Sequence, residues 1–157
     1  MSSVKVADEV VDKRRGREHI GVSVGAVVHD GTGRILLMKR GPKARDEHGN
    51  WDVCGGTIEF GESVDETIRR EVREELCTET FEIDFLTAYE AIRQHNGTQT
   101  HWIILINAVR VDPSKVKIGE PEKISEIGWF TLDTLPSPMH SQFHKALEAI
   151  KQSGIAG

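Results

Sequence analysis

The stretch GTIEFGESVDETIRREVREELCT, residues 56–78, carries three glutamates within one turn of a helix. Glu71, Glu74 and Glu75 stand at i, i+3 and i+4, a spacing that makes their side chains neighbours on a helix surface. Each pair of like charges at this spacing destabilises an isolated helix by about 0.2–0.5 kcal/mol. A chain that keeps all three therefore needs solvent or a cation beside them.

The same stretch predicts where this helix begins and which side of it faces the core. Ser63, followed three residues later by Glu66, forms a capping-box pattern that predicts a helix over residues 64–76. At about 100° per residue, the apolar residues at 64, 68, 72 and 76 form one stripe. Glu75 falls inside this stripe and Glu71 at its edge, whereas a surface helix ordinarily keeps its carboxylates on the opposite side.

Partial burial of these carboxylates predicts a bound cation. Two carboxylates about 5 Å apart repel by roughly 3 kcal/mol at an effective dielectric constant of about 20. A donor set made only of oxygen suits Mg²⁺, Mn²⁺ or Ca²⁺ better than zinc. Upstream, Gly55 and Gly56 let the backbone approach a ligand, and Glu62 adds a fourth carboxylate. The competing interpretation is a solvated helix face of alternating glutamate and arginine.

The composition of the whole chain narrows the class of protein. Its 157 residues favour one domain, large enough to form a core without disulfides. A net charge of −5 gives no basic excess for duplex nucleic acid. Cys54 and Cys77 form no CxxC pattern, which fits a reducing compartment. No run of 18 apolar residues is present, and the first 20 residues lack the apolar core of a secretion signal. We therefore expect a cytoplasmic protein that does not span a membrane.

The pattern along the chain predicts an α+β fold with a mixed β-sheet and helices packed on it. Residues 1–18 are charge-rich and are expected to form a mobile N-terminal arm, and residues 19–157 a single domain. Strands are expected over residues 21–30, 31–40, 51–56, 81–94, 100–111 and 125–130. The strand over 100–111 is apolar on both faces and should be central. A C-terminal helix should bury a stripe of Met139, Phe143, Ala146, Leu147 and Ile150.

Residues 56–78 resemble the Nudix box. That box is Gly, five residues, Glu, seven residues, Arg-Glu, an apolar residue, any residue, Glu-Glu, any residue, Gly and an apolar residue. Seven positions match in register: Gly56, Glu62, Arg70, Glu71, Val72, Glu74 and Glu75. The resemblance to small MutT-like Nudix enzymes extends over roughly residues 20–153 of this chain.

Three positions differ from the pattern of the family. Cys77 stands where the box has its last glycine, and Thr78 stands where it has an apolar residue. Both positions concern the turn after the helix and not the metal ligands. Cys54 stands where the family often has proline before the glycine pair, and we interpret it as a small core residue.

The resemblance implies a Nudix-type α/β/α sandwich, with a mixed sheet between helices, and hydrolysis of a diphosphate linkage in a nucleotide. Mg²⁺, or Mn²⁺, is the implied cofactor, which would lower the pKa of a bound water. The implied metal ligands are Glu71, Glu74, Glu75 and the carbonyl of Gly56. The implied catalytic residues are Glu74, Glu75 and Arg70, with Glu62 supporting the loop. Either Glu74 or Glu75 would accept the proton from water, and the sequence does not choose between them.

The implied substrate is a small nucleotide. The marks of the ADP-ribose, NADH and coenzyme A subgroups are absent, which favours a (deoxy)nucleoside triphosphate cleaved to monophosphate and pyrophosphate. The alternatives are hydrolysis of ADP-ribose or another nucleoside diphosphate derivative, and a non-catalytic module that senses a nucleotide. The resemblance also allows a homodimer.

Basic and acidic residues outside the box have two interpretations. Arg40, Lys43 and Arg45 precede the box and could meet the phosphate chain, or form a solvated basic loop. Glu122, or its neighbour Glu120, could supply a further carboxylate from the loop before the last strand, as related enzymes do.

Aromatic residues and histidines also have two interpretations. Trp51, Trp102 and Phe130 could stack on a base, but aromatic residues in strands more often belong to the core. His140 and His144 are spaced as a metal pair at i and i+4, but no third ligand is evident in the sequence. The structural interpretation is favoured for all five.

Overall fold

The computed structural model describes residues 14–157. The predicted arm over residues 1–18 thus lies mostly outside the described residues. Its last part forms a turn in which the Gly16 amide donates to the carbonyl of His19 at 2.7 Å. The neighbouring Arg15 pairs with Glu59 at 2.9 Å, so this turn contacts the loop that precedes the glutamate-rich helix.

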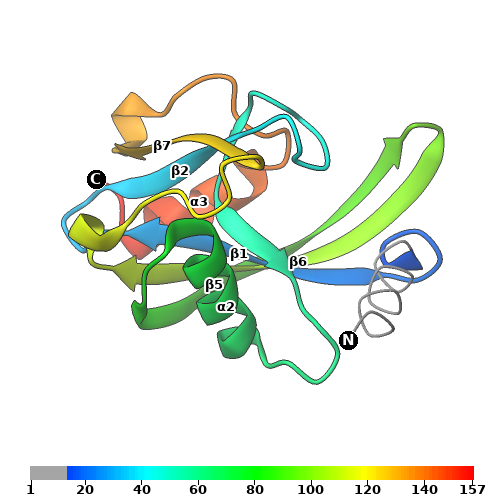
Figure 1. Ribbon diagram of the computed structural model, residues 1–157, viewed down its shortest axis with the longest axis horizontal. Helices are drawn as coiled ribbons and strands as arrows, with labels where there is room; N and C mark the ends of the chain where they lie inside the picture. The colour runs from blue at the N-terminus through cyan, green and yellow to red at the C-terminus, as the bar shows by residue number, and fades with distance from the viewer. Residues whose placement is uncertain (1–13) are drawn as a thin grey trace.

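Seven strands form one mixed sheet (Figure 1). They are β1 (Gly21–His29), β2 (Ile35–Arg40), β3 (Trp51–Asp52), β4 (Cys54–Thr57), β5 (Thr80–His95), β6 (Thr98–Val111) and β7 (Ile124–Phe130). The main order is β3-β2-β1-β6-β5, with β4 paired to β1 and β7 paired to β2. Only β1 and β6 run parallel among these pairs. The strand predicted to be central, β6, lies between β1 and β5, which confirms that prediction.

Helices cover both faces of the sheet, so the predicted α/β/α sandwich is confirmed (Figure 1). The helices are α2 (Val64–Leu76) and α3 (His144–Ser153), and short 3₁₀ turns are η1 (Pro113–Lys115) and η2 (Leu132–Thr134). Alternation along β1 builds two cores. Val24, Ala26 and Val28 pack in the cluster that contains Val72 of α2. Val27 packs in the cluster that contains Ile150 of α3.

A long hairpin of β5 and β6 projects from the body of the protein (Figure 1). Its turn places Asn96 and Gly97 at φ 50° and 78°, the left-handed conformations that an Asn-Gly hairpin turn requires. β5 pairs only with β6 among the described strands and exposes Phe81 and Phe85.

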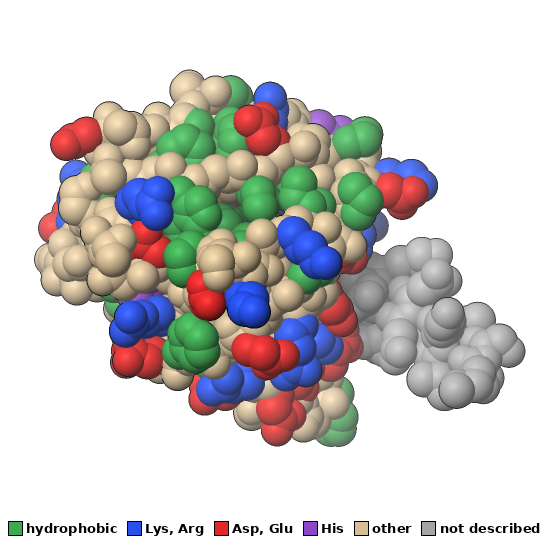
Figure 2. Space-filling view, turned by 60° about the vertical axis from the view of Figure 1, so that its left-hand side comes forward, with side chains coloured by type: hydrophobic (Ala, Val, Ile, Leu, Met, Phe, Trp, Pro, Cys, Tyr) green, Lys and Arg blue, Asp and Glu red, His purple; other side chains and the backbone are tan. Residues whose placement is uncertain are grey.

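Figure 2 shows one face of the protein, where a group of hydrophobic side chains is bordered by acidic and basic ones. The homodimer stays a prediction.

Two elements differ from the sequence prediction. The single strand expected over residues 51–56 is two strands, because β3 pairs with β2 and β4 pairs with β1, and the chain changes partner at Val53. Met139, expected on the stripe of the last helix, lies before α3 and forms a β-bridge with Trp51.

Among residues 14–157, no helix has the length and apolar character needed to cross a membrane.

Candidate active site

Both ends of α2 are fixed by local hydrogen bonds. The Ser63 hydroxyl accepts the Glu66 amide at 3.1 Å, and the Glu66 carboxylate accepts the Ser63 amide at 3.4 Å. This confirms the predicted capping box and the helix over residues 64–76. At the other end Cys77 adopts the left-handed conformation, with φ 56°, and its amide donates to the carbonyl of Arg73. Cys77, which stands where the Nudix pattern has glycine, therefore still adopts the left-handed backbone conformation that glycine favours.

The predicted phase of α2 is confirmed by the burial of its side chains. Ile68, Val72 and Leu76 are fully buried. Glu75 is 8% exposed, whereas the side chain of Glu74 is 49% exposed. The side chain of Glu71, at the edge of the stripe, is 13% exposed. Two of the three box glutamates are thus largely removed from water.

Burial changes the acidity of these two carboxyls. Burial, followed by the charge of Glu71, raises the pKa of Glu75 well above its usual value. Burial also raises the pKa of Glu71, although Arg70 opposes that shift. Because desolvation disfavours the charged form, a cation bound beside the pair would stabilise both carboxylates.

Glu75 receives its hydrogen bonds from β4. Its Oε1 accepts the Gly55 amide at 3.2 Å and faces the Cys54 thiol at 3.6 Å. Burial raises the pKa of the Cys54 thiol well above its usual value. Cys54 is fully buried, as its interpretation as a core residue required. Its contact with Glu75 was not anticipated, because the two residues are 21 positions apart.

Arg70 connects the loop to the helix. Its Nε and Nη2 donate to the two carboxylate oxygens of Glu62 at 2.7 and 2.9 Å. Its Nη1 donates to Glu71 at 2.8 Å, and its Nη2 also donates to the carbonyl of Thr57. The hydrogen bonds from Arg70 are the main reason that the pKa of Glu62 is lowered to about 2. One guanidinium thus holds a box glutamate, a loop glutamate and the loop backbone together.

The glycine pair allows the backbone of β4 to lie directly against the helix. A Cβ on Gly56 would lie 2.1 Å from a carboxylate oxygen of Glu71, and a Cβ on Gly55 would lie 2.2 Å from the carbonyl oxygen of Val24. At Gly55 the obstacle is backbone, so no side chain fits there, and at Gly56 a side chain would displace the Glu71 carboxylate. The carboxylates of Glu71 and Glu75 therefore meet the glycine backbone of β4, and these oxygen donors fit a hard divalent ion such as Mg²⁺.

The loop after β6 brings a further carboxylate to this site. Amides of Lys117 and Gly119 donate to the carbonyls of Leu76 and Glu75, which satisfies the C-terminal end of α2. This docking brings Glu120 close enough that its charge adds to the causes that raise the pKa of Glu75. Glu120 itself forms an ion pair with Lys123 at 3.6 Å.

The predicted phosphate contacts have other partners in the structure. Glu122 forms an ion pair with Lys43 at 3.2 Å, and both side chains are largely exposed. Arg40 donates to the backbone and the carboxylate of Asp46 at 2.7 and 3.0 Å. Arg45 is exposed, and its guanidinium lies 5.1 Å from the ring centre of Trp102. None of these contacts involves a box glutamate, and substrate contacts of these residues stay predictions.

The aromatic residues lie in packed surroundings. Trp51 is buried and meets Phe130 edge to face, with ring centres 5.4 Å apart. Trp102 packs so closely on Gly16 and Gly21 that a Cβ on either would overlap its ring. These contacts support the core interpretation of Trp51 and Phe130, whereas Trp102 belongs to neither core cluster.

The two histidines do not form a metal pair. His144 Nδ1 donates to the carbonyl of Ser141 at 3.0 Å, whereas His140 pairs with Glu47 at 2.9 Å. Potential ligand atoms of Asp46, Glu47 and His140 lie within 4.8 Å of one another. Two arginines already bind this cluster's carboxylates: Arg40 contacts Asp46 at 3.0 Å, and Arg93 contacts Glu47 at 2.8 Å. The charges are therefore matched without an ion.

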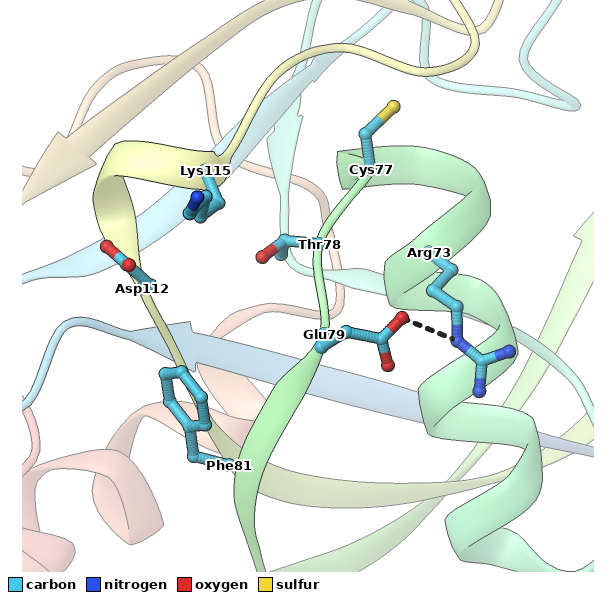
Figure 3. A pocket seen from close by; sticks show the side chains of 7 residues that line it. All are labelled: Arg73, Cys77, Thr78, Glu79, Phe81, Asp112 and Lys115. Atoms are coloured by element: carbon cyan, nitrogen blue, oxygen red, sulfur yellow. Dashed lines mark ion pairs between the residues drawn. The ribbon is translucent and has the colours of Figure 1, made fainter.

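A cavity of about 460 Å³ lies on another side of α2 (Figure 3). It is lined by Arg73, Cys77, Thr78, Glu79, Phe81, Asp112 and Lys115. Arg73 and Glu79 form an ion pair of 3.5 Å at its edge. On the helix, Arg73 is about 160° from Glu75, so this cavity does not contain the box carboxylates. The candidate active site is instead the surface between β4, α2 and the 117–120 loop.

Comparison with known proteins finds similar sequences and structures. A NUDIX domain model matches residues 19–149. A crystal structure of a MutT NUDIX hydrolase from Burkholderia pseudomallei is 32% identical, with a TM-score of 0.75 over 84% of this chain and 98% of that one. A CTP pyrophosphohydrolase from Escherichia coli K12 is 32% identical over 80 residues, and an NAD-capped RNA hydrolase NudC from Pseudomonas aeruginosa is 29% identical over 110 residues.

The matches to these two curated enzymes are partial. The first covers 51% of this chain and 57% of the enzyme, and the second covers 70% of this chain and 36% of the enzyme. This chain therefore spans about half the length of the first enzyme and about a third of the second.

Proposed function

This chain belongs to the NUDIX family, and from that premise we propose that it hydrolyses a diphosphate linkage in a nucleotide with the aid of a divalent metal ion. The proposed substrate is a nucleoside triphosphate, which water converts to a nucleoside monophosphate and pyrophosphate. The observation that carries the proposal is the pair of largely buried carboxylates, Glu71 and Glu75, held against a glycine backbone, of which only Glu71 pairs with a basic side chain among the described residues.

The residues divide into those that would hold the ion and those that would handle the proton. Glu71 and Glu75 are fixed by Arg70 and by Gly55, and we assign them, with the Gly56 backbone, to binding Mg²⁺ or Mn²⁺. When bound, such an ion neutralises phosphate charge and lowers the pKa of a bound water. Glu74 is half-exposed and has only a 3.5 Å contact with Arg70, so we assign it as the proton acceptor.

Arg70 and Glu62 position these groups. The two-pronged contact between them fixes the loop over residues 57–62 relative to α2, and the remaining guanidinium nitrogen holds Glu71. A planar guanidinium can make these contacts at once, whereas a lysine ammonium cannot reproduce the fork. Arg70→Lys is therefore expected to lower kcat while leaving the chain folded.

The proposal is tested with purified protein, Mg²⁺ and a panel of nucleotides. The expected result is release of pyrophosphate from at least one nucleoside triphosphate, with loss by a factor of about 10² or more in Glu75→Gln and Glu74→Gln. Glu75→Gln should also weaken Mn²⁺ binding, whereas Glu74→Gln should affect kcat more than binding. Glu79→Gln, which changes an exposed glutamate in the cavity of Figure 3, is the matched control and should retain full activity.

The panel also separates the alternatives by their products. Release of two monophosphates from ADP-ribose or from a dinucleotide would move the substrate to another nucleoside diphosphate derivative. Tight nucleotide binding without any product would support a sensing module. Undiminished activity in Glu75→Gln would refute the assigned site.

A further inference from the structure

Cys54 lies where the box glutamates meet the sheet. It is the first residue of β4 and is fully buried in the core cluster beneath α2. Its Sγ lies 3.6 Å from Glu75 Oε1, the same oxygen that accepts the Gly55 amide at 3.2 Å. Two consecutive residues of one strand thus direct their donors at one carboxylate oxygen.

These two donors constrain the orientation of the whole carboxylate. The last torsion of a glutamate side chain has only broad preferences, so its plane rotates easily unless it is held. Holding Oε1 sets this torsion, and two donors hold that oxygen more firmly than one. Because both contact Oε1, the other oxygen is left for other partners.

We propose that Cys54 is a positioning residue for Glu75, whose thiol holds Oε1 so that Oε2 is available to a divalent ion. The inference rests on the metal site of the proposed function. A thiol is a weak donor, but a hydrogen bond in a buried, low-dielectric setting is electrostatically stronger than the same bond in water. The proline that the Nudix pattern often has at this position has no side-chain donor, so this contact is a property of this chain.

Direct metal binding tests the proposal without requiring turnover. Mn²⁺ is titrated into metal-free protein, and the free ion is followed by electron paramagnetic resonance. Mutating a residue that hydrogen-bonds to a metal ligand typically lowers metal affinity by 10–100-fold. Because a thiol is a weak donor, we expect Cys54→Ala to weaken Mn²⁺ binding by about tenfold. Cys54→Ser keeps a donor at this position and should recover affinity to within about threefold of the wild type.

Two control variants separate positioning from packing. Val109→Ala removes volume from the same core cluster at a fully buried position in β6 and should leave Mn²⁺ affinity unchanged. Cys77→Ala removes the other thiol, which is exposed, and should also leave it unchanged. Equal affinity in Cys54→Ala and the wild type would overturn the proposal, as would a Cys54→Ser variant that binds as weakly as Cys54→Ala.

The S–H stretching band in the infrared spectrum reports the hydrogen bond itself. In Cys77→Ser, Cys54 is the only thiol of the chain, since the sequence has two cysteines. Its band should lie at lower frequency than that of the exposed Cys77 thiol in Cys54→Ala. Adding Glu75→Gln removes the charge of the acceptor and should shift the Cys54 band back toward higher frequency. A band that does not respond to Glu75→Gln would overturn the proposal.

These measurements distinguish the inference from the proposed function. Mn²⁺ affinity that depends on Cys54, in a protein that cleaves no nucleotide, would refute the function and support the positioning role. Pyrophosphate release with Mn²⁺ affinity independent of Cys54 would refute only the positioning role. A wild-type protein that binds no Mn²⁺ would overturn both.

Discussion

Replacing Cys77 by glycine should stabilise the protein, although it removes a side chain. Cys77 ends α2 with φ 56° and ψ 31°, a left-handed conformation in which a Cβ approaches the following carbonyl oxygen. That conformation costs a residue with a Cβ about 1–2 kcal/mol, whereas glycine adopts it freely. The side chain is exposed, so its removal sacrifices little burial.

The opposing effect is the freedom of glycine in the unfolded chain. This entropy costs roughly 0.5–1 kcal/mol relative to alanine. The net gain in the free energy of unfolding is therefore about 0.5–1 kcal/mol, which for a chain of this size raises Tm by about 1–4 °C. The hydrogen bond from the residue-77 amide to the Arg73 carbonyl is unaffected, because it uses only backbone atoms.

Urea denaturation of metal-free protein at pH 7 measures this gain. Cys77→Ala is the matched control, because it removes the thiol but keeps the Cβ and hence the strain. Cys77→Gly should have the higher denaturation midpoint of the two, and both should have the same m-value. If Cys77→Gly is no more stable than Cys77→Ala, the backbone of residue 77 is not strained, and the reasoning fails.

Three further predictions concern charged groups. Although burial opposes the shift, hydrogen bonds from Thr32 and Arg34 lower the pKa of Asp30 to about 2, from an ordinary 3.8. The ionised Asp30 therefore stabilises the protein fully above about pH 4, and this stabilisation is lost as the pH falls through 2. Asp30→Asn should lower the free energy of unfolding by about 2 kcal/mol at pH 7. Below pH 4 its urea midpoint should depend less on pH than the midpoint of the wild type. Because the pKa of Glu75 is raised, its ionised form destabilises the metal-free protein at pH 7, and Glu75→Gln should raise the metal-free Tm while abolishing its increase by Mg²⁺. Arg70→Gln leaves carboxylates without their cation and should cost about 3 kcal/mol by urea denaturation, and a loss below about 1 kcal/mol would contradict the structural role of Arg70.

The part of the site that lies on α2 could be predicted because its information is local. Ser63 and Glu66 are three residues apart and mark the start of the helix, and the apolar stripe fixes which carboxylates are buried. The prediction that Glu75 lies on the side of α2 that faces the core required only the rotation of about 100° per residue in a helix. The Asn96–Gly97 turn fixed the hairpin for the same reason, since two residues determine its backbone.

The remaining contacts join segments that no local pattern relates. Arg45 had two interpretations, a phosphate contact or a solvated basic loop, and its cation–π contact with Trp102 on the hairpin belongs to neither. The break between β3 and β4 at Val53 depends on which neighbour each strand pairs with, and that choice is made by the sheet as a whole. The contact of Arg45 with Trp102 and the break at Val53 could not be predicted from the types of the side chains. Both depend on which distant segments the fold brings together.

The buried position of Glu75 follows from a comparison of two energies. Rotating α2 by one residue would bring Glu75 toward water and relieve a repulsion of roughly 3 kcal/mol. The same rotation would expose Ile68, Val72 and Leu76, each of which contributes about 1.5–3 kcal/mol by burial, or roughly 6 kcal/mol together. The apolar stripe therefore holds the carboxylates in place even without an ion, and the site is formed before metal binds. Amide hydrogen exchange in α2 should accordingly slow on addition of Mg²⁺ without any change in which of its amides are protected. Protection that appears only with Mg²⁺ would show that the ion, and not the core, sets the phase of the helix.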